Sequence, residues 1–184
     1  MFEAFMYKPP EKHKDEEAHR DRTGKEWEEF AKERDKSNRL VEALKKGDPA
    51  VLPKVNEEGL LLQYLPKELR ADHSIVLNAV KNDPHALEFA DKKLKDDFEI
   101  VMAAVEQWGT MLSQASSRLK DDESIAVAAV TSHSDALRDV SSRLQDNENI
   151  VSIAVNKNPS TIEYASRRLR KDKDFRARLG LPME

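Results

Sequence analysis

The stretch that decides the fold is LKDDFEIVMAAV at residues 94–105, because close copies of it recur along the chain. It returns as LKDDESIAVAAV at 119–130 and LQDNENIVSIAV at 144–155, and it is preceded by LRADHSIVLNAV at 69–80, which gives a period of 25 residues. No insertion or deletion interrupts this register. A fixed period of this length is the signature of a repeat architecture, in which each unit buries its apolar face against its neighbours.

Within one unit, the pattern predicts helices. Asp97 is a good N-cap, because its carboxylate can accept hydrogen bonds from the free N–H groups of a first helical turn. The apolar residues at 100, 101, 104 and 105 then follow helical spacing. We expect the helix to end near Gly109, with the glycine in a left-handed exit, and corresponding breaks near 59, 84, 134 and 159. Leu112, Ala115 and Leu119 lie at i, i+3 and i+7, which predicts a second helix in the unit.

The fold class predicted is therefore all-α, a short α-solenoid of 25-residue helix-turn-helix repeats with an N-terminal cap helix and an extended N-terminal tail. Helices of about ten residues are marginal in isolation, so packing between units must hold them. The expected divisions are a charged tail at 1–22, a cap helix at 23–46 and a repeat array at 44–179, with units 44–68, 69–93, 94–118, 119–143 and 144–168 and a half-unit 169–179.

Two apolar patches mark the cap helix. Leu40, Val41 and Leu44 are expected to pack on the first unit and cover the end of the array. Trp27 and Phe30, with the alanine that follows, either extend this cap or form a binding site for a partner.

An aromatic cluster begins the chain. Phe2, Phe5, Met6 and Tyr7 lie within seven residues and are separated from the array by a stretch dense in charge. They are either a frayed end or a short anchor that docks on another protein, since aromatic and Met side chains are frequent binding anchors.

A basic column follows the repeat along one edge of the array. Lys93, Arg118, Arg143 and Arg168 are one period apart, and Arg170 and Lys171 extend the basic character at the C-terminal end. These cations complement the helix dipole where helices end, and they neighbour an acidic column. The alternative is a track for the phosphates of RNA, although the stacking aromatic residues of such surfaces do not recur here.

No constellation of residues indicates catalysis. The chain contains no Cys, its net charge is −4, and its five His residues lack the spacing of metal ligands. The paired acids recur at helix starts, as caps do, and there is no glycine-rich phosphate loop. We therefore expect no enzyme activity, no cofactor and no metal. No apolar run is long enough to span a membrane and the first residues do not form a signal peptide. The expected location is the cytoplasm, or a large cytoskeletal or organellar assembly.

The unit L-x-x-D-x-x-I-V-x-A-A-V, followed by A-L-x-x-A-S-x-x-L, resembles a tandem helical repeat family, domain of unknown function 4116, which is common in protists. The resemblance covers about residues 60–175. It implies the helical repeat fold and carries over no catalytic residue or ligand. The function expected is a non-catalytic scaffolding subunit that binds other protein subunits within a larger complex. The alternative is RNA binding through the basic edge.

Overall fold

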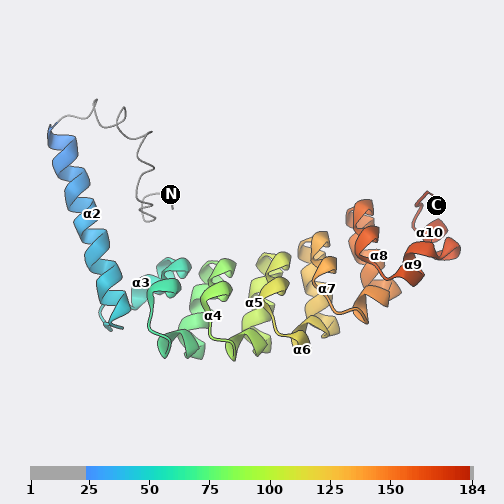
Figure 1. Ribbon diagram of the computed structural model, residues 1–184, viewed down its shortest axis with the longest axis horizontal. Helices are drawn as coiled ribbons and strands as arrows, with labels where there is room; N and C mark the ends of the chain where they lie inside the picture. The colour runs from blue at the N-terminus through green and yellow to red at the C-terminus, as the bar shows by residue number, and fades with distance from the viewer. Residues whose placement is uncertain (1–23, 183–184) are drawn as a thin grey trace.

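The computed structural model describes residues 24–182, with side chains from residue 29 onward. The helices of the repeat units lie side by side in one row (Figure 1). Over this range the chain is helical and contains no strand, which confirms the predicted all-α class. One layer of the row consists of ten-residue α-helices, each packed on the next: α4 His73–Asn82, α5 Phe98–Gln107, α7 Glu123–Ser132 and α8 Glu148–Lys157.

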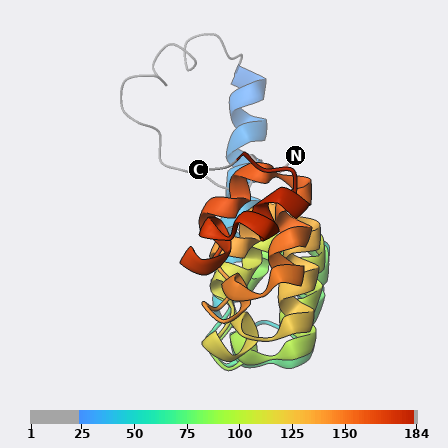
Figure 2. The ribbon, with the colours of Figure 1, turned by 90° about the vertical axis from the view of Figure 1, so that its right-hand side faces the viewer.

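The second layer is built of 3-10 helices, which also contact one another from unit to unit. They are η2 Gly59–Tyr64, η4 Pro84–Phe89, η6 Gly109–Gln114, η7 Ser134–Arg138 and η9 Pro159–Tyr164. A short third segment completes each unit and leads into the next α-helix: η3 Leu69–Ala71, η5 Leu94–Asp96, α6 Ser117–Lys120, η8 Leu144–Asp146 and α9 Arg167–Lys171. Figure 2, viewed from the C-terminal end of the row, shows successive units behind one another.

The prediction of one second helix per unit was wrong. Ala115 is extended, with φ −71° and ψ 159°, and separates the 3-10 helix η6 from α6. The reason is a bond between units: the backbone N–H of Ser116 donates to Lys95 O at 2.9 Å. Equivalent bonds run from residue 91 to 70, from 141 to 120 and from 166 to 145, at 2.8 to 2.9 Å. The chain therefore breaks its helix to bond the preceding unit.

The role predicted for Gly109 was also wrong. Among the described residues, positive φ occurs at Gly47 and Gly180, and Gly109 does not have it. Instead, a Cβ on Gly109 would lie 2.1 Å from the backbone oxygen of Ala129, and one on Gly59 would lie 2.3 Å from that of Ala79. These two glycines are required because the next unit's α-helix passes too close for any side chain.

The caps and the core follow the repeat as predicted. Asp97 accepts a hydrogen bond from the Ile100 N–H at 3.1 Å, and the residues one period away cap their helices in the same manner. The helix breaks occur at the expected positions. Ile100, Ala104 and Leu119 are fully buried in a single apolar core that continues from unit to unit.

The two ends differ from the repeat. At the N-terminal end, α2 Gly24–Lys45 is followed by Gly47 in the left-handed region and by α3 Pro53–Glu57. Leu44 is buried and Leu40 packs on the core, but the rest of α2 leads away from the row (Figure 1). Phe30, nearer the start of α2, is 39% exposed. At the other end, α10 Lys173–Arg178 closes the core with Phe175.

Candidate partner-binding site

The basic column lies against an acidic column of the preceding unit. Arg118 Nε is 3.0 Å from Asp96 Oδ1, and the same pair recurs as Arg143–Asp121 at 3.0 Å and Arg168–Asp146 at 2.9 Å. Each guanidinium also donates to the backbone oxygen of its aspartate. The carboxylates accept a second bond from the hydroxyls of Ser116, Ser141 and Ser166. We refer to these nine residues as the Asp–Ser–Arg ladder.

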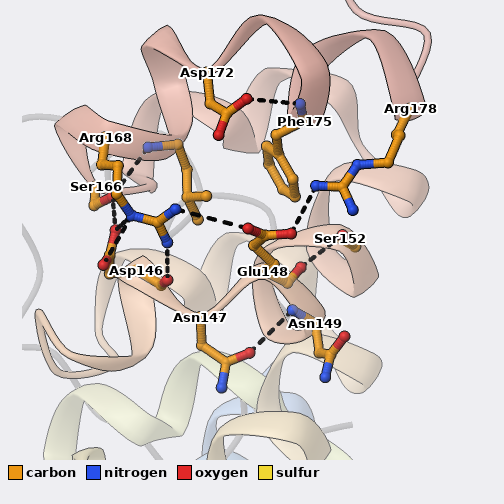
Figure 3. Close-up of polar contacts among 11 residues, drawn as sticks. Asp146, Asn147, Glu148, Asn149, Ser152, Ser166, Arg168, Asp172, Phe175 and Arg178 are labelled. Atoms are coloured by element: carbon orange, nitrogen blue, oxygen red, sulfur yellow. Dashed lines mark hydrogen bonds and ion pairs between the residues drawn. The ribbon is translucent and has the colours of Figure 1, made fainter.

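The last rung of the ladder is part of a larger polar cluster, shown in Figure 3. Arg168 lies between Asp146 and Glu148, and its Nη1 is 3.6 Å from Glu148 Oε1. Arg178 reaches the same carboxylate from α10, with Nη2 at 2.7 Å from Oε2. Glu148 thereby joins the terminal helix to the last full unit.

The ladder also changes the acidity of its carboxyl groups. The hydrogen bond from Ser141 and then that from Arg143 lower the pKa of Asp121 below its ordinary value. Ser116 and Arg118 lower the pKa of Asp96, and Ser166 and Arg168 that of Asp146. The charges are thus held in the ionised form that pairs with arginine.

The ends of the predicted basic edge lie outside the ladder. Ala71 occupies the position of the ladder aspartates one unit earlier, so no carboxylate from that column faces Lys93. Lys93 is exposed, and so are Arg170 and Lys171 on α9. The structure therefore does not bring the six predicted cations together as one free stripe.

Most of the predicted anchor residues fall outside what the structure describes. This applies to Phe2, Phe5, Met6 and Tyr7, which precede residue 24. Trp27 lies in the first turn of α2, before the first described side chain. Phe30 follows one turn later and is 39% exposed.

A surface that the sequence reasoning missed lies between α5 and α7. It is a shallow groove lined by Met102 and Glu106 of α5 and by residues of successive turns of α7: Glu123, Ser124, Val127, Ala128, Thr131 and Ser132. Val127 is 39% exposed although it lies in an apolar run, between the buried pairs Ile125–Ala126 and Ala129–Val130. The sequence did contain one signal of this surface. Leu77, Met102 and Val127 are one period apart, and their repeat position is next to the buried columns and is not one of them.

A cluster of tilted aromatic rings lies at the end of α5. Trp108, 43% exposed, lies with its ring centroid 4.3 Å from that of His133 and 5.9 Å from that of His85. His133 is held in place because its Nδ1 accepts the Gly109 N–H at 3.2 Å. Three successive units thus contribute to one exposed ring cluster.

A further pattern concerns the ends of the α-helices. Asn82 donates to Glu57 O at 3.0 Å, Gln107 donates to Val80 O at 3.1 Å, and Lys157 donates to Thr131 O. These residues share one position of the repeat, and each one reaches back to a carbonyl in the last turn of the preceding α-helix. We refer to them as the cross-unit donors.

The pattern of cross-unit donors is broken in the groove. At the junction of α5 and α7, this repeat position is Ser132, the last residue of α7. Its short hydroxyl lies 3.0 Å from His133 Nδ1 and does not reach a carbonyl of α5. Within residues 24–182, the last-turn carbonyls of α5 receive no cross-unit donor. Glu106 and Trp108 lie at this same end of the groove.

The described part of the chain contains neither a cluster of metal ligands nor a membrane-spanning helix. Residues 24–182 contain no group of three or more His, Asp and Glu side chains that could hold a metal ion. Over the same range, none of the helices has the length and apolar character needed to cross a membrane.

Comparison with known proteins identifies the repeat. The family model of a domain of unknown function, DUF4116, matches three tandem segments, 51–95, 97–145 and 147–176. Neither the curated proteins nor the solved structures contain a significant match to the chain. The first two matches each span nearly two of the 25-residue units, and the three together cover more than half of the sequence. The chain therefore belongs to the DUF4116 family of tandem helical repeats.

Proposed function

We propose that the protein is a non-catalytic scaffolding subunit that binds other proteins through its repeat array. The observation that carries this proposal is the placement of exposed large apolar side chains in the central units. Phe98, Trp108 and Val127 are each between 39% and 45% exposed, although the array has a continuous core that could bury such residues. Exposed aromatic residues on a rigid support are the usual anchors of protein interfaces.

The array also provides the rigidity that such a function needs. Backbone bonds, the Asp–Ser–Arg ladder and the cross-unit donors join consecutive units, so a partner meets a surface that is already ordered. A preorganised surface binds with a smaller loss of conformational entropy.

The alternative function is binding of RNA through the basic edge. It is supported by the exposed cations Lys93, Arg170 and Lys171. The three arginines between them are engaged by aspartates of the ladder, so an incoming phosphate would have to compete with a carboxylate for each one.

A titration with fluorescent single-stranded RNA at several salt concentrations separates the two functions. Each phosphate contact releases counterions and steepens the dependence of affinity on salt. We expect no binding tighter than about 1 μM at physiological salt, the tight end of the range of non-specific association. Submicromolar binding that weakens steeply with salt, and that is lost in an Arg118→Gln, Arg143→Gln double variant, would replace the scaffold proposal with the RNA proposal.

A further inference from the structure

We propose that the groove between α5 and α7 binds a short amphipathic helical segment of another protein, whose apolar face packs on Met102 and Val127 and whose Lys or Arg side chain caps the C-terminal end of α5. This inference rests on the scaffold function and names the partner's chemistry.

The shape of the groove favours a helix as the occupant. Its lining residues on α7, from Ser124 to Ser132, follow successive turns of one side of that helix, so the groove runs along the helix axis. The ten residues of α7 extend about 15 Å, which accommodates nearly three turns of a partner helix. Ser124 and Ala128 are short, and they allow a close approach.

The charge of the surface favours a basic occupant. Glu99, Glu106 and Glu123 are the ionisable residues of α5 and α7, and neither helix contains Lys or Arg. Glu123 forms an ion pair with Arg143, with Oε1 3.0 Å from Nη1. The other acidic residue of the groove lining is Glu106, beside the end of α5. A cation placed there would meet both this carboxylate and the negative end of the α5 dipole.

The break in the cross-unit donors supplies the independent argument for that cation. At the next junction, the ammonium group of Lys157 occupies the equivalent place and donates to carbonyls of the last turn of α7. At the end of α5, the equivalent residue is Ser132, whose short side chain places no cation beside the last-turn carbonyls. A Lys or Arg of the partner would complete the pattern that the chain itself completes on either side.

Trp108 provides a reporter at the same end of the groove. Because the chain has two tryptophans, the Trp27→Phe variant isolates the emission of Trp108. The probe is a synthetic helical peptide of about 14 residues, four turns, with Leu at i, i+3, i+4 and i+7 positions and Lys on the flanks. The control probe has the same Leu residues and carries Glu in place of Lys.

Three variants in this background test the site. Val127→Lys removes the apolar contact, and Ser132→Lys supplies the chain's own cation beside the last-turn carbonyls of α5. Ser142→Lys adds the same charge at an exposed position of the same unit that does not line the groove, and it serves as the matched control. Melting curves are recorded for each variant, and we expect none to unfold earlier than the parent by more than a few degrees.

We expect the Lys peptide to bind with a dissociation constant in the micromolar range and to shift the emission of Trp108. Val127→Lys and Ser132→Lys should each weaken it at least tenfold, a loss typical of truncated interface anchors. Ser142→Lys should change it less than twofold, and the Glu peptide should bind at least tenfold more weakly. Equal binding of the two peptides, or unchanged binding to both groove variants, would overturn the assignment of this groove.

The failure of this inference is distinguishable from failure of the scaffold function. If proteins that co-purify with the full chain are retained by both groove variants, partners bind elsewhere on the array and this site is wrong. If instead the chain binds RNA with a steep salt dependence and carries no proteins, the scaffold function itself is wrong.

Discussion

At Gly109, two neighbouring units approach each other too closely for a side chain. A Cβ at this position would lie 2.1 Å from the backbone oxygen of Ala129. The same position of other units holds residues that have a Cβ: Pro84, Ser134 and Pro159. The distance from this position to the next α-helix therefore cannot be equal at every junction. A single sequence reveals that glycine recurs here, but not whether a turn or a neighbouring chain requires it.

Replacing Gly109 with Ala should therefore destabilise the array by about 1–3 kcal/mol, the usual cost of forcing an extra carbon into a packed site. Ser134→Ala is the matched control, because the position already holds a side chain, and it should cost less than about 0.5 kcal/mol. Urea unfolding of both variants measures the difference. Equal stability of the two would show that the contact is relieved by a small backbone shift.

The lowered pKa of Asp121 makes a prediction about pH. Because its folded-state pKa lies below the unfolded value, the group contributes stability that is present above about pH 4 and is lost as the pH falls through the folded pKa. Asp121→Asn keeps an oxygen that can accept from Ser141 but removes the charge. The variant should melt earlier than the parent at pH 7, and the gap should close below about pH 4.

Melting curves across this pH range check the prediction. A gap that stays constant down to acid pH would mean that the ladder acts through its hydrogen bonds alone and that the charge contributes nothing.

At the scale of elements, the sequence predicts the first α-helix of each unit well and the rest poorly. The α-helices have an apolar stripe, an Asp or Asn cap and a clear end, so local chemistry determines them. The second half of each unit also has helical spacing, from Leu112 to Leu119, yet it splits at Ala115. The split is caused by the bond between Ser116 and Lys95 of the preceding unit, and no local propensity encodes a bond to another unit.

The short element α6 provides a direct test of burial. Leu119 is fully buried and its neighbour Ser117 is exposed. Leu119→Ala should cost about 2–5 kcal/mol because it leaves a cavity in the core. Ser117→Ala should cost less than about 0.5 kcal/mol. The opposite ranking in denaturant unfolding would mean that the third segment of the unit faces the other way.

The candidate site was predictable only in part. The arginine column was visible in the sequence, and its proximity to an acidic column suggested the pairing that the structure shows. The α5–α7 groove was not predicted, because Val127 resembles one more core residue in a run of apolar residues. Its exposure depends on which side of α7 the next unit covers, and that is a property of the stacked units.

At the scale of the whole molecule, Leu44 is part of the core at the N-terminal end of the array and Leu40 packs against it. Deleting residues 1–10 should therefore leave the melting midpoint of the protein within about 2 °C of the parent, less than the shift from a loss of 1 kcal/mol in a domain of this size. If the aromatic cluster is an anchor, the same deletion should weaken incorporation into the native complex. A large drop in the midpoint with unchanged partner recovery would contradict both expectations.

The scaffold function predicts that proteins, and not nucleic acid, hold the chain in its native assembly. The most direct measurement is quantitative recovery of co-purifying proteins with the full chain, with Val127→Lys, and with the Arg118→Gln, Arg143→Gln double variant, before and after nuclease treatment. We expect nuclease and the arginine variant to change recovery less than twofold, and Val127→Lys to reduce at least one specific partner tenfold or more, in keeping with the loss of an interface anchor. Recovery that nuclease or the arginine variant abolishes, with no effect of Val127→Lys, would contradict the account.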